Sequence, residues 1–364
     1  MYRQLILALI AVLTLAGCGS TQSIPERGDS ARSGVFSSRI TTTEPQLQWQ
    51  QSLDSEVRGG LAFARGMLLL GTESGEVLAV DENDGQILWR RSLESAVRGS
   101  PAIEGSRVYV GDQAGKLHAL DLDSGDTLWR VDNGRAISAS PQATDLGIVV
   151  ADVSGRVSLL DRDDGHRYWR TDTGGSIHAA AAEGDGRVFV GTSRGRIVGL
   201  DLGSGEERWE YQTDEAVYGG VAIQGQFGFF GDLNGRVRSL FLSVGVENWH
   251  FDTAADIGAP LAVDGDEIFV ADRSGRIYAL REDLGLRIWQ RRVADHWISA
   301  GPVLGGNGLL VAARDGSLTA LDKGDGSVLW RLETGDSLGA SPLVLPGRRI
   351  ALVTRSGELI MLGP

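Results

Sequence analysis

Several short motifs in this sequence combine residue types that support catalysis in other proteins. Gly191-Thr192-Ser193-Arg194-Gly195 matches the Gly-x-Ser-x-Gly pattern, in which an exposed serine acts as a nucleophile. A hydrolase elbow requires a strand, a turn and a helix, but this stretch occupies the same repeat position as the turn at Gly71-Thr-Glu-Ser-Gly75 between two strands. The sequence therefore predicts a structural turn here.

Metal binding is the second chemistry that the residue types suggest. Asp121-Leu-Asp123-Ser-Gly125-Asp126 alternates carboxylates as a calcium loop does, yet it recurs at 161–165 and 81–85 without the closing glutamate that such a loop needs. Asx-type turns explain this pattern. The histidines show no metal-ligand spacing and are His118, His166, His178, His250 and His296. We predict no metal and no cofactor.

These motifs lie inside a strict internal repeat. The tryptophans that define it are Trp49, Trp89, Trp129, Trp169, Trp209, Trp249, Trp289 and Trp330. Six successive gaps are 40 residues and the seventh is 41. A period of this length is typical of one four-stranded propeller blade, and its regularity excludes long insertions.

Two glycines recur at fixed distances before the tryptophan. One lies fourteen residues before it, at Gly75, Gly115, Gly155, Gly195, Gly235, Gly275 and Gly316, and again at Gly357 in a last copy without tryptophan. The other lies four residues before it, at Gly85, Gly125, Gly165, Gly205, Gly245, Gly285 and Gly326. Both lie in short polar stretches between alternating apolar runs, which predicts tight hairpins that need a positive φ.

The copies predict how the ring closes. Each unit supplies an inner strand near Ser100-Pro101, a second at 107–111, a third at 116–120 and an outer strand at 126–130. Inner-to-third units number eight, but the first outer strand, around Leu47-Gln-Trp49, precedes them all, and the last unit ends without one. We therefore predict an all-β, eight-bladed β-propeller of four-stranded antiparallel blades, closed by the N-terminal strand completing the last blade.

The N-terminal residues predict export and anchoring. Arg3 and the apolar run Leu5 to Leu15 are typical of a signal peptide over residues 1–17. Leu15-Ala16-Gly17-Cys18 resembles the lipobox of bacterial lipoproteins, which predicts lipidation of Cys18, the only cysteine. Residues 18–43 lack apolar periodicity and predict a flexible tether, and residues 44–364 form the propeller. Gly19 and Ser20 are similar to the pattern of lipoproteins sent to the outer membrane, facing the periplasm.

Charge restricts the partners of this chain. It carries 35 Lys and Arg against 48 Asp and Glu, a formal net charge of −13. Such a surface repels nucleic acid and anionic lipid headgroups, so we expect no nucleic-acid ligand and contact with a membrane through the lipid anchor alone.

The repeat resembles a known superfamily. The Ala-Leu-Asp-x-x-x-Gly-x-x-x-Trp pattern at Ala119 to Trp129 and Ala320 to Trp330 is similar to the tryptophan-docking repeat of the pyrroloquinoline-quinone propellers. With eight blades, a lipobox and no insertions, the whole chain resembles the BamB family of lipoproteins in the outer-membrane β-barrel assembly machinery. This resemblance implies a non-catalytic scaffold that binds the POTRA domains of BamA, other Bam proteins and unfolded outer-membrane proteins.

Two other functions share this architecture. Quinoprotein dehydrogenases have the same repeats, but they often place a pair of adjacent cysteines against a calcium-bound quinone, and this chain has only Cys18. A propeller that binds peptidoglycan or another glycan at its channel would need aromatic and carboxylate side chains clustered on one face. Neither alternative is as well supported as the scaffold.

A partner-binding face can be placed from the strand directions. The connectors from each outer strand to the next inner strand share one face with the turns between second and third strands. These connectors carry a series of apolar or aromatic residues that we expect to ring the channel mouth, at Val57-Arg58, Val97-Arg98, Ile137, Ile177-His178, Val217-Tyr218, Ile257 and Trp297-Ile298. Trp297 lies outside the tryptophan repeat and is a candidate anchor.

The resemblance adds residues to this candidate face. By repeat register, the BamA-binding stretch of the family falls on Val217 and Tyr218, and its paired aspartates fall near Trp297 and Ser299. None of these residues is identical to the family's pattern. The candidate partner-binding residues are therefore Arg58, Arg98, Val217, Tyr218, Trp297, Ile298 and Ser299, and no residue is assigned a catalytic role.

Overall fold

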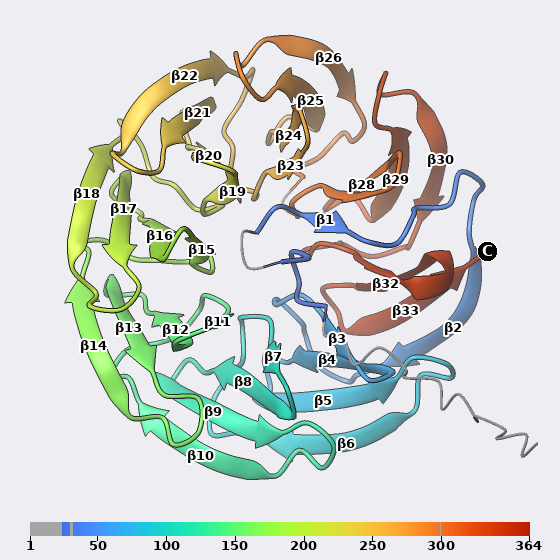
Figure 1. Ribbon diagram of the computed structural model, residues 1–364. Coiled ribbons are helices and arrows are strands. Elements are labelled where there is room, and N and C mark those ends of the chain that lie inside the picture. The colour runs from blue at the N-terminus through green and yellow to red at the C-terminus, as the bar shows by residue number, and fades with distance from the viewer. Residues whose placement is uncertain (1–23, 30–31, 299) are drawn as a thin grey trace, which may run out of the picture.

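Eight small sheets form a closed ring in this protein (Figure 1). The structure is a computed structural model that describes residues 24–29, 32–298 and 300–364. Each sheet has four antiparallel strands, and the sheets follow one another around the ring in chain order, so each is one blade of a propeller. The predicted all-β, eight-bladed architecture is confirmed.

The first four blades are built from consecutive strands. Blade 1 contains β3 (Ala62–Ala64), β4 (Met67–Gly71), β5 (Glu76–Asp81) and β6 (Ile87–Ser92). Blade 2 contains β7 (Ala102–Glu104), β8 (Arg107–Gly111), β9 (Lys116–Asp121) and β10 (Thr127–Asp132). Blade 3 contains β11 (Gln142–Thr144), β12 (Gly147–Ala151), β13 (Arg156–Leu160) and β14 (Arg167–Asp172). Blade 4 contains β15 (Ala182–Gly184), β16 (Arg187–Gly191), β17 (Arg196–Asp201) and β18 (Glu207–Gln212).

The remaining blades include the two that the N-terminal residues join. Blade 5 contains β19 (Ala222–Gln224), β20 (Phe227–Gly231), β21 (Arg236–Phe241) and β22 (Val246–Asp252). Blade 6 contains β23 (Ala262–Asp264), β24 (Glu267–Ala271), β25 (Arg276–Arg281) and β26 (Arg287–Arg292). Blade 7 contains β27 (Val303–Gly305), β28 (Gly308–Ala312), β29 (Ser317–Asp322), β30 (Val328–Glu333) and, parallel to β27, β1 (Val35–Phe36). Blade 8 contains β31 (Leu343–Leu345), β32 (Arg349–Val353), β33 (Glu358–Gly363) and β2 (Gln46–Ser52), with the 3-10 turn η1 (Pro346–Arg348).

A β-bulge precedes the tryptophan in every outer strand. In blade 2, Thr127 pairs with Leu120 and Trp129 with Ala119, so Leu128 has no partner. The same shift occurs in the other seven blades. A bulge turns the residues around it, and here the skipped side chain faces solvent, with Leu128 48% exposed. The indole that follows is thereby directed toward the neighbouring blade.

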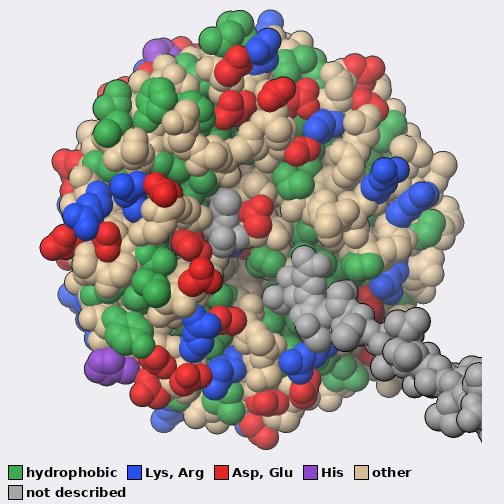
Figure 2. Space-filling model, viewed as in Figure 1, with side chains coloured by type: hydrophobic (Ala, Val, Ile, Leu, Met, Phe, Trp, Pro, Cys, Tyr) green, Lys and Arg blue, Asp and Glu red, His purple; other side chains and the backbone are tan. Residues whose placement is uncertain are grey.

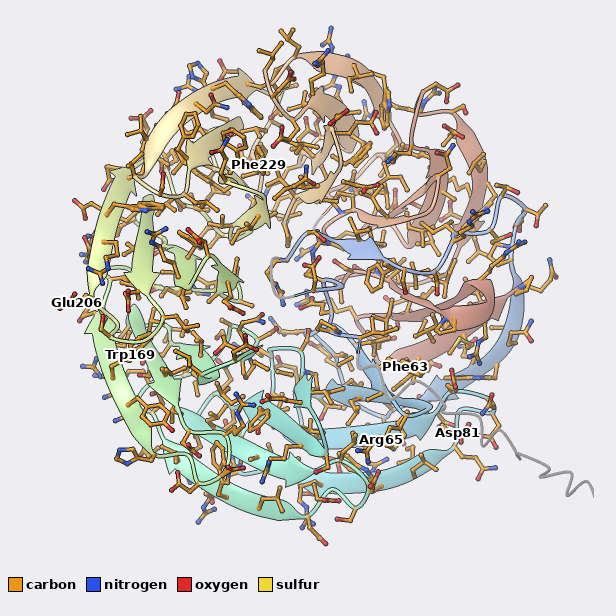
Figure 3. The ribbon with its side chains drawn as sticks, viewed as in Figure 1. Phe63, Arg65, Asp81, Trp169, Glu206 and Phe229 are labelled. Carbon is orange, nitrogen blue, oxygen red and sulfur yellow. The ribbon has the colours of Figure 1, made fainter. Side chains whose placement is uncertain are left out.

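Each tryptophan docks on the next blade. Its indole N–H donates a hydrogen bond to a backbone carbonyl that lies seven residues before the tryptophan of that next blade. The donor and acceptor pairs at 2.7–3.2 Å are Trp49 and Glu82, Trp89 and Leu122, Trp129 and Arg162, Trp169 and Leu202, Trp209 and Leu242, Trp249 and Glu282, and Trp289 and Lys323. Figure 3 labels Trp169 on β14 of blade 3 and Glu206 on blade 4, the neighbouring blade on which this tryptophan docks.

The recurrent glycine four residues before the tryptophan serves the same joint. At Gly125, a Cβ atom would lie 2.5 Å from the Trp89 ring, and φ is +70°. The equivalent glycines show the same close approach to the indole of the preceding blade, from Gly85 against Trp49 to Gly326 against Trp289. The glycine is required both by the left-handed turn and because the indole occupies the position of a side chain.

The N-terminal strand closes the ring as predicted. β2 pairs antiparallel with β33, from Gln46 opposite Gly363 to Ser52 opposite Glu358. Trp330 then completes the last joint, since its indole donates to the carbonyl of Thr41 at 2.9 Å. Thr41 lies eight residues before Trp49, in the segment that leads into β2. It replaces the turn between third and outer strands, which blade 8 lacks because β33 and β2 are not consecutive in the chain.

The flexible tether expected over 18–43 needs correction. Residues 18–23, like the predicted signal peptide and Cys18, lie outside the described residues. Ile24, however, exchanges backbone hydrogen bonds with Phe63 of β3, β1 pairs with β27, and Phe36 and Ile40 are buried in the core between blades 7, 8 and 1. These contacts could not be predicted, because the segment has no repeat and few apolar residues.

Within the residues that the structure describes, no helix is long and apolar enough to cross a membrane.

The tryptophan joint predicts a large difference between two glycines of one blade. Gly105 has φ +60° with no atom near an added Cβ, so Gly105→Ala carries only the backbone strain of about 1–2 kcal/mol. Gly125→Ala has the same strain and also displaces the Trp89 indole, which adds about 1–3 kcal/mol. Urea unfolding followed by tryptophan fluorescence measures both. Equal loss of stability in the two variants would contradict the proposed role of the joint.

Candidate partner-binding face

Two kinds of loop define the two faces of the ring. The turns between second and third strands and the connectors from outer to inner strands form what we call the connector face. The remaining turns, such as that at Arg65 and that following Asp81, form the hairpin face, and both of these residues are labelled in Figure 3. Within the connector face, turns and connectors are hydrogen-bonded to each other. In blade 2, for example, the Gln113 N–H of the turn donates to the Ala96 carbonyl of the preceding connector at 2.9 Å.

The apolar residues of the connectors do not surround the channel mouth as expected. They are at most 3% exposed and are Val57, Val97, Ile137, Ile177, Val217, Ile257 and Ile298. A Cβ atom added to Gly71 would lie 2.2 Å from the Val97 side chain, and one added to Gly111 would lie 2.2 Å from the Ile137 side chain. Each of these side chains therefore fills the space beside a glycine at the end of a second strand. Their burial makes Val217 and Ile298 part of the core between blades and removes them as surface contacts.

The polar and aromatic neighbours of these residues do reach the mouth. Arg58, Arg98, His178 and Tyr218 line one hollow at the centre of the connector face. The His178 and Tyr218 rings meet edge to face at 5.3 Å between centroids, and burial lowers the pKa of His178. The structure thus brings three of the predicted residues, Arg58, Arg98 and Tyr218, to one site.

The floor of this hollow is the N-terminal segment. Glu26 and Arg32 line it from below, and Arg27 between them is fully buried in the hub. The Arg27 guanidinium donates to the carbonyls of Leu261 at 2.5 Å and Pro302 at 3.0 Å, at the starts of the inner strands of blades 6 and 7. Burial, followed by the charge of Arg32, lowers the pKa of Arg27 to about 10. The segment therefore plugs the channel from the inside (Figure 1).

A shared carboxylate organises one side of the mouth. Both oxygens of Glu73 accept hydrogen bonds from the Arg98 guanidinium, at 2.8 and 3.1 Å, and Arg58 Nε lies 3.0 Å from Glu73 Oε1. The bond from Arg98 is the main cause that lowers the pKa of Glu73, and it raises the pKa of Arg98. Arg58 and Arg98 remain 40% exposed in their side chains.

Trp297 lies on the same face, in the connector from blade 6 to blade 7. Its side chain is 47% exposed, and the guanidinium carbons of Arg273 and Arg314 lie over its ring at 4.7 and 5.3 Å from the centroid. Arg273 also pairs with Asp256 at 3.3 Å. Ser299, the remaining predicted contact, lies outside the described residues.

Sequence reasoning missed the arginines of the second-to-third turns. Arg273, Arg314 and Arg355 occupy one register, two residues before the recurrent glycine, in three successive blades. The same register holds Glu73, Gln113, Val153, Ser193 and Leu233 in the other blades. Comparing the copies position by position, rather than looking only for what recurs, would have revealed this run of charge.

The other motifs take the structural roles predicted for them. Ser193 lies in the turn between β16 and β17, where its hydroxyl accepts a hydrogen bond from the Ser176 N–H at 3.1 Å. Asp121 Oδ1 accepts bonds from the Asp123 and Ser124 N–H groups, as an Asx turn requires. In the described part of the chain, no three His, Cys, Asp or Glu side chains are grouped so that they could hold a metal ion.

The sequence matches the family described as outer membrane protein assembly factor BamB over residues 37–151, 97–241 and 233–364. No curated protein matches the chain. The crystal structure of BamB from Moraxella catarrhalis is similar, with 20% identity and a TM-score of 0.78 over 88% of this chain and 100% of that one.

Propellers with other roles share the fold. The computationally designed Ika8 protein aligns with 16% identity and a TM-score of 0.80, over 88% of this chain and 100% of its own. The quinohemoprotein alcohol dehydrogenase from Comamonas testosteroni aligns with 15% identity and a TM-score of 0.81, over 93% of this chain and 80% of its own. At these identities the similarity shows the fold alone.

The buried Arg27 guanidinium predicts how strongly the N-terminal segment is held in the hub. Arg27→Ala leaves the Leu261 and Pro302 carbonyls without this donor, so we expect amide hydrogen exchange in residues 24–36 to accelerate at least about tenfold, for a loss of about 1.4 kcal/mol or more. Arg39→Ala is the matched control, because Arg39 belongs to the same N-terminal segment and is exposed. Unchanged exchange in Arg27→Ala would show that the plug is held by other contacts.

Proposed function

This chain belongs to the family of the outer membrane protein assembly factor BamB, and from that premise we propose that it is a non-catalytic scaffold of the β-barrel assembly machinery. The observation that supports this role is the connector face: a rigid ring presents an exposed Trp297, Tyr218 and several arginines around a mouth that its own chain closes. Exposed aromatics and arginines on a rigid support are the usual anchors of protein interfaces.

We propose that this face binds the POTRA domains of BamA. Arg58, Arg98, Tyr218 and Trp297 are the accessible members of the predicted contact set. Other Bam proteins and unfolded outer-membrane proteins are further partners that family membership supports. A scaffold of this kind acts by holding the periplasmic part of the machine in one geometry.

The hub does not fit the quinone chemistry of the dehydrogenase propellers. Glu26 and Arg32 line the hollow at the channel mouth, and Arg27 reaches the backbone of two inner strands. The described residues also lack a donor set for calcium at the mouth. This occupied hub supports the scaffold over the dehydrogenase.

Anchoring through Cys18 would orient the ring. Cys18 lies 24 − 18 = 6 residues before Ile24, which is hydrogen-bonded near the hairpin-face end of β3. Six extended residues span at most about 20 Å. We therefore propose an outer-membrane lipoprotein that faces the periplasm, with its hairpin face near the bilayer and its connector face directed away from it.

The anchor is tested by Cys18→Ser in the full-length precursor. We expect the variant to move from the membrane fraction to the soluble fraction of the envelope, since a lipid chain supplies about 0.8 kcal/mol per buried CH₂ group. Fractionation and metabolic labelling with palmitate measure the change. Persistent labelling of the variant would rule out Cys18 as the lipidated residue.

The partner face is tested by substitution of the exposed Trp297 and the half-buried Tyr218. Trp297→Glu and Tyr218→Glu together remove two anchors and add charge, so we expect co-purification with BamA to fall at least about tenfold. Leu286→Glu is the control, because Leu286 is 58% exposed on the hairpin face. Equal recovery of BamA with both proteins would exclude the connector face, and loss only in the control would place the contact on the hairpin face.

A further inference from the structure

Four apolar side chains are exposed where the third strand turns into the outer strand in blades 5 and 6. They are Val244, Val246, Leu284 and Leu286, each between 55% and 58% exposed, and we call them the apolar rim. Blades 5 and 6 are neighbours in the ring, so the two turns lie on adjacent blades of the hairpin face (Figure 1). Apolar side chains that gather on the surface of a soluble protein often mark a contact with a partner or a membrane.

The other turns of this kind hold polar residues at the same two positions, five and three residues before the tryptophan. These pairs are Asp84 and Gln86, Ser124 and Asp126, Asp164 and His166, Ser204 and Glu206, and Asp325 and Ser327. In each of the five pairs the first side chain accepts a hydrogen bond from the backbone N–H of the second residue, at 2.8–3.3 Å. Valine and leucine side chains cannot accept such a bond, so the requirements of the turn do not explain the apolar rim.

The first residue of the turn changes in the same two blades. In blades 1 to 4 and 7 it is an aspartate whose Oδ1 accepts from the N–H two residues later. Blades 5 and 6 have Phe241 and Arg281 there. Gly245 and Gly285 nevertheless have φ +68° and +66°, close to the +70° of Gly125 in blade 2. The backbone of the turn is therefore kept while its polar side chains are replaced.

The N-terminal segment enters the ring from the same face. Ile24 pairs antiparallel with Phe63 of β3, and β3 runs toward the turn at Arg65 on the hairpin face. The chain therefore reaches Ile24 from the hairpin-face side. With a lipid on Cys18, six residues before Ile24, extended chain allows at most about 20 Å between the two. Such an anchor holds the hairpin face close to a bilayer.

We propose that the apolar rim enters the surface of the phospholipid bilayer in which Cys18 is anchored. Apolar side chains at the tips of turns leave water when they enter the boundary between headgroups and acyl chains. Blade 5 is the fourth blade after blade 1 in a ring of eight, so the rim lies across the ring from the blade that holds Ile24. Anchor and rim would be two separate contacts, which together fix the tilt of the ring. This inference rests on the anchoring in the proposed function.

The charges beside the rim favour neutral lipid over anionic lipid. Within residues 241–247 and 281–287 the charged side chains are Glu247, Arg281, Glu282, Asp283 and Arg287. Two arginines against three carboxylates give no attraction for anionic headgroups. The contact is therefore apolar, and we expect it to be insensitive to salt.

A bilayer fits the rim better than a second copy of the chain does. A specific protein interface buries about 800 Å² and about 20–30 residues on each partner. Four side chains on two turns do not supply such a surface, whereas entry into a bilayer requires no matching surface on a partner.

Nitroxide quenching in vesicles tests the proposal on the lipidated full chain. Leu284→Cys supplies one free thiol for a fluorophore, since Cys18 is the only other cysteine and carries the lipid. In phosphatidylcholine vesicles that contain a nitroxide-labelled lipid, we expect quenching at least about twofold stronger than for the same fluorophore at Ser124→Cys. Ser124 is the matched position of blade 2. Quenching should not change between about 50 and 300 mM salt.

The rim itself is tested by adding Val246→Asp/Leu286→Asp to Leu284→Cys. These changes introduce the residue that blade 2 has at Asp126, so the turns should still form, and thermal unfolding checks the ring. We expect quenching to fall to the level of Ser124→Cys. Equal quenching at the two labelled positions, or unchanged quenching in the Asp variant, would overturn the proposal. So would a fluorescence change of Leu284→Cys that depends on protein concentration without vesicles, because it would assign the rim to a second copy.

The outcomes separate this inference from the proposed anchoring. If Cys18 is lipidated but Leu284→Cys is quenched no more than Ser124→Cys, the rim proposal fails and the anchoring stands. If Cys18 carries no lipid, the anchoring fails, and the same vesicles are added to Cys18→Ser/Leu284→Cys and Cys18→Ser/Ser124→Cys. Stronger quenching of the first then supports the rim as a membrane contact, and equal quenching overturns it.

Discussion

The packing of one tryptophan on the backbone of the next blade is the interaction on which this molecule depends. An indole buries about 150–250 Å², which corresponds to about 4–6 kcal/mol of gross hydrophobic stabilisation, and its hydrogen bond adds about 1 kcal/mol net. The bulge that precedes the tryptophan directs the ring outward from its own blade, and a glycine receives it. Eight such joints leave every blade held on both sides, so the loops of the two faces have fixed positions.

That rigidity explains how residues distant in sequence come to form one surface. Arg58 lies in the connector from blade 8 to blade 1 and Trp297 in the connector from blade 6 to blade 7, and neither connector contains a long insertion. Their relative placement is determined by the angle between blades. The space-filling view shows charged and apolar side chains interspersed over one face of the ring (Figure 2).

Much of the fold could be predicted because the pattern of one blade occurs eight times in the sequence. Strand positions, the number of blades and closure by β2 all follow from the spacing of tryptophan and glycine. The candidate face was harder. Val217 and Ile298 are buried although Tyr218 and Trp297 beside them reach the surface. The only sign of this in the sequence is a glycine such as Gly191, whose missing Cβ leaves the space that the Val217 side chain fills.

The hub could not be predicted for a different reason. Arg27 is a charged residue in a segment without periodicity, and its acceptors are backbone carbonyls 234 and 275 residues away along the chain. No local pattern encodes such a contact. A lone arginine in a polar stretch is usually exposed, and here the closed ring supplies the carbonyls that make its burial favourable.

The pairing of β2 with β33 determines when the ring can close during synthesis. Gln46 and Gly363 pair across 363 − 46 = 317 residues, and closing a loop of that length instead of a ten-residue hairpin costs about 3 kcal/mol more in chain entropy. Until residues 358–363 have been synthesised, β2 has no partner strand. The incomplete chain therefore remains an open stack of blades with an exposed edge strand until β33 is available to pair with β2.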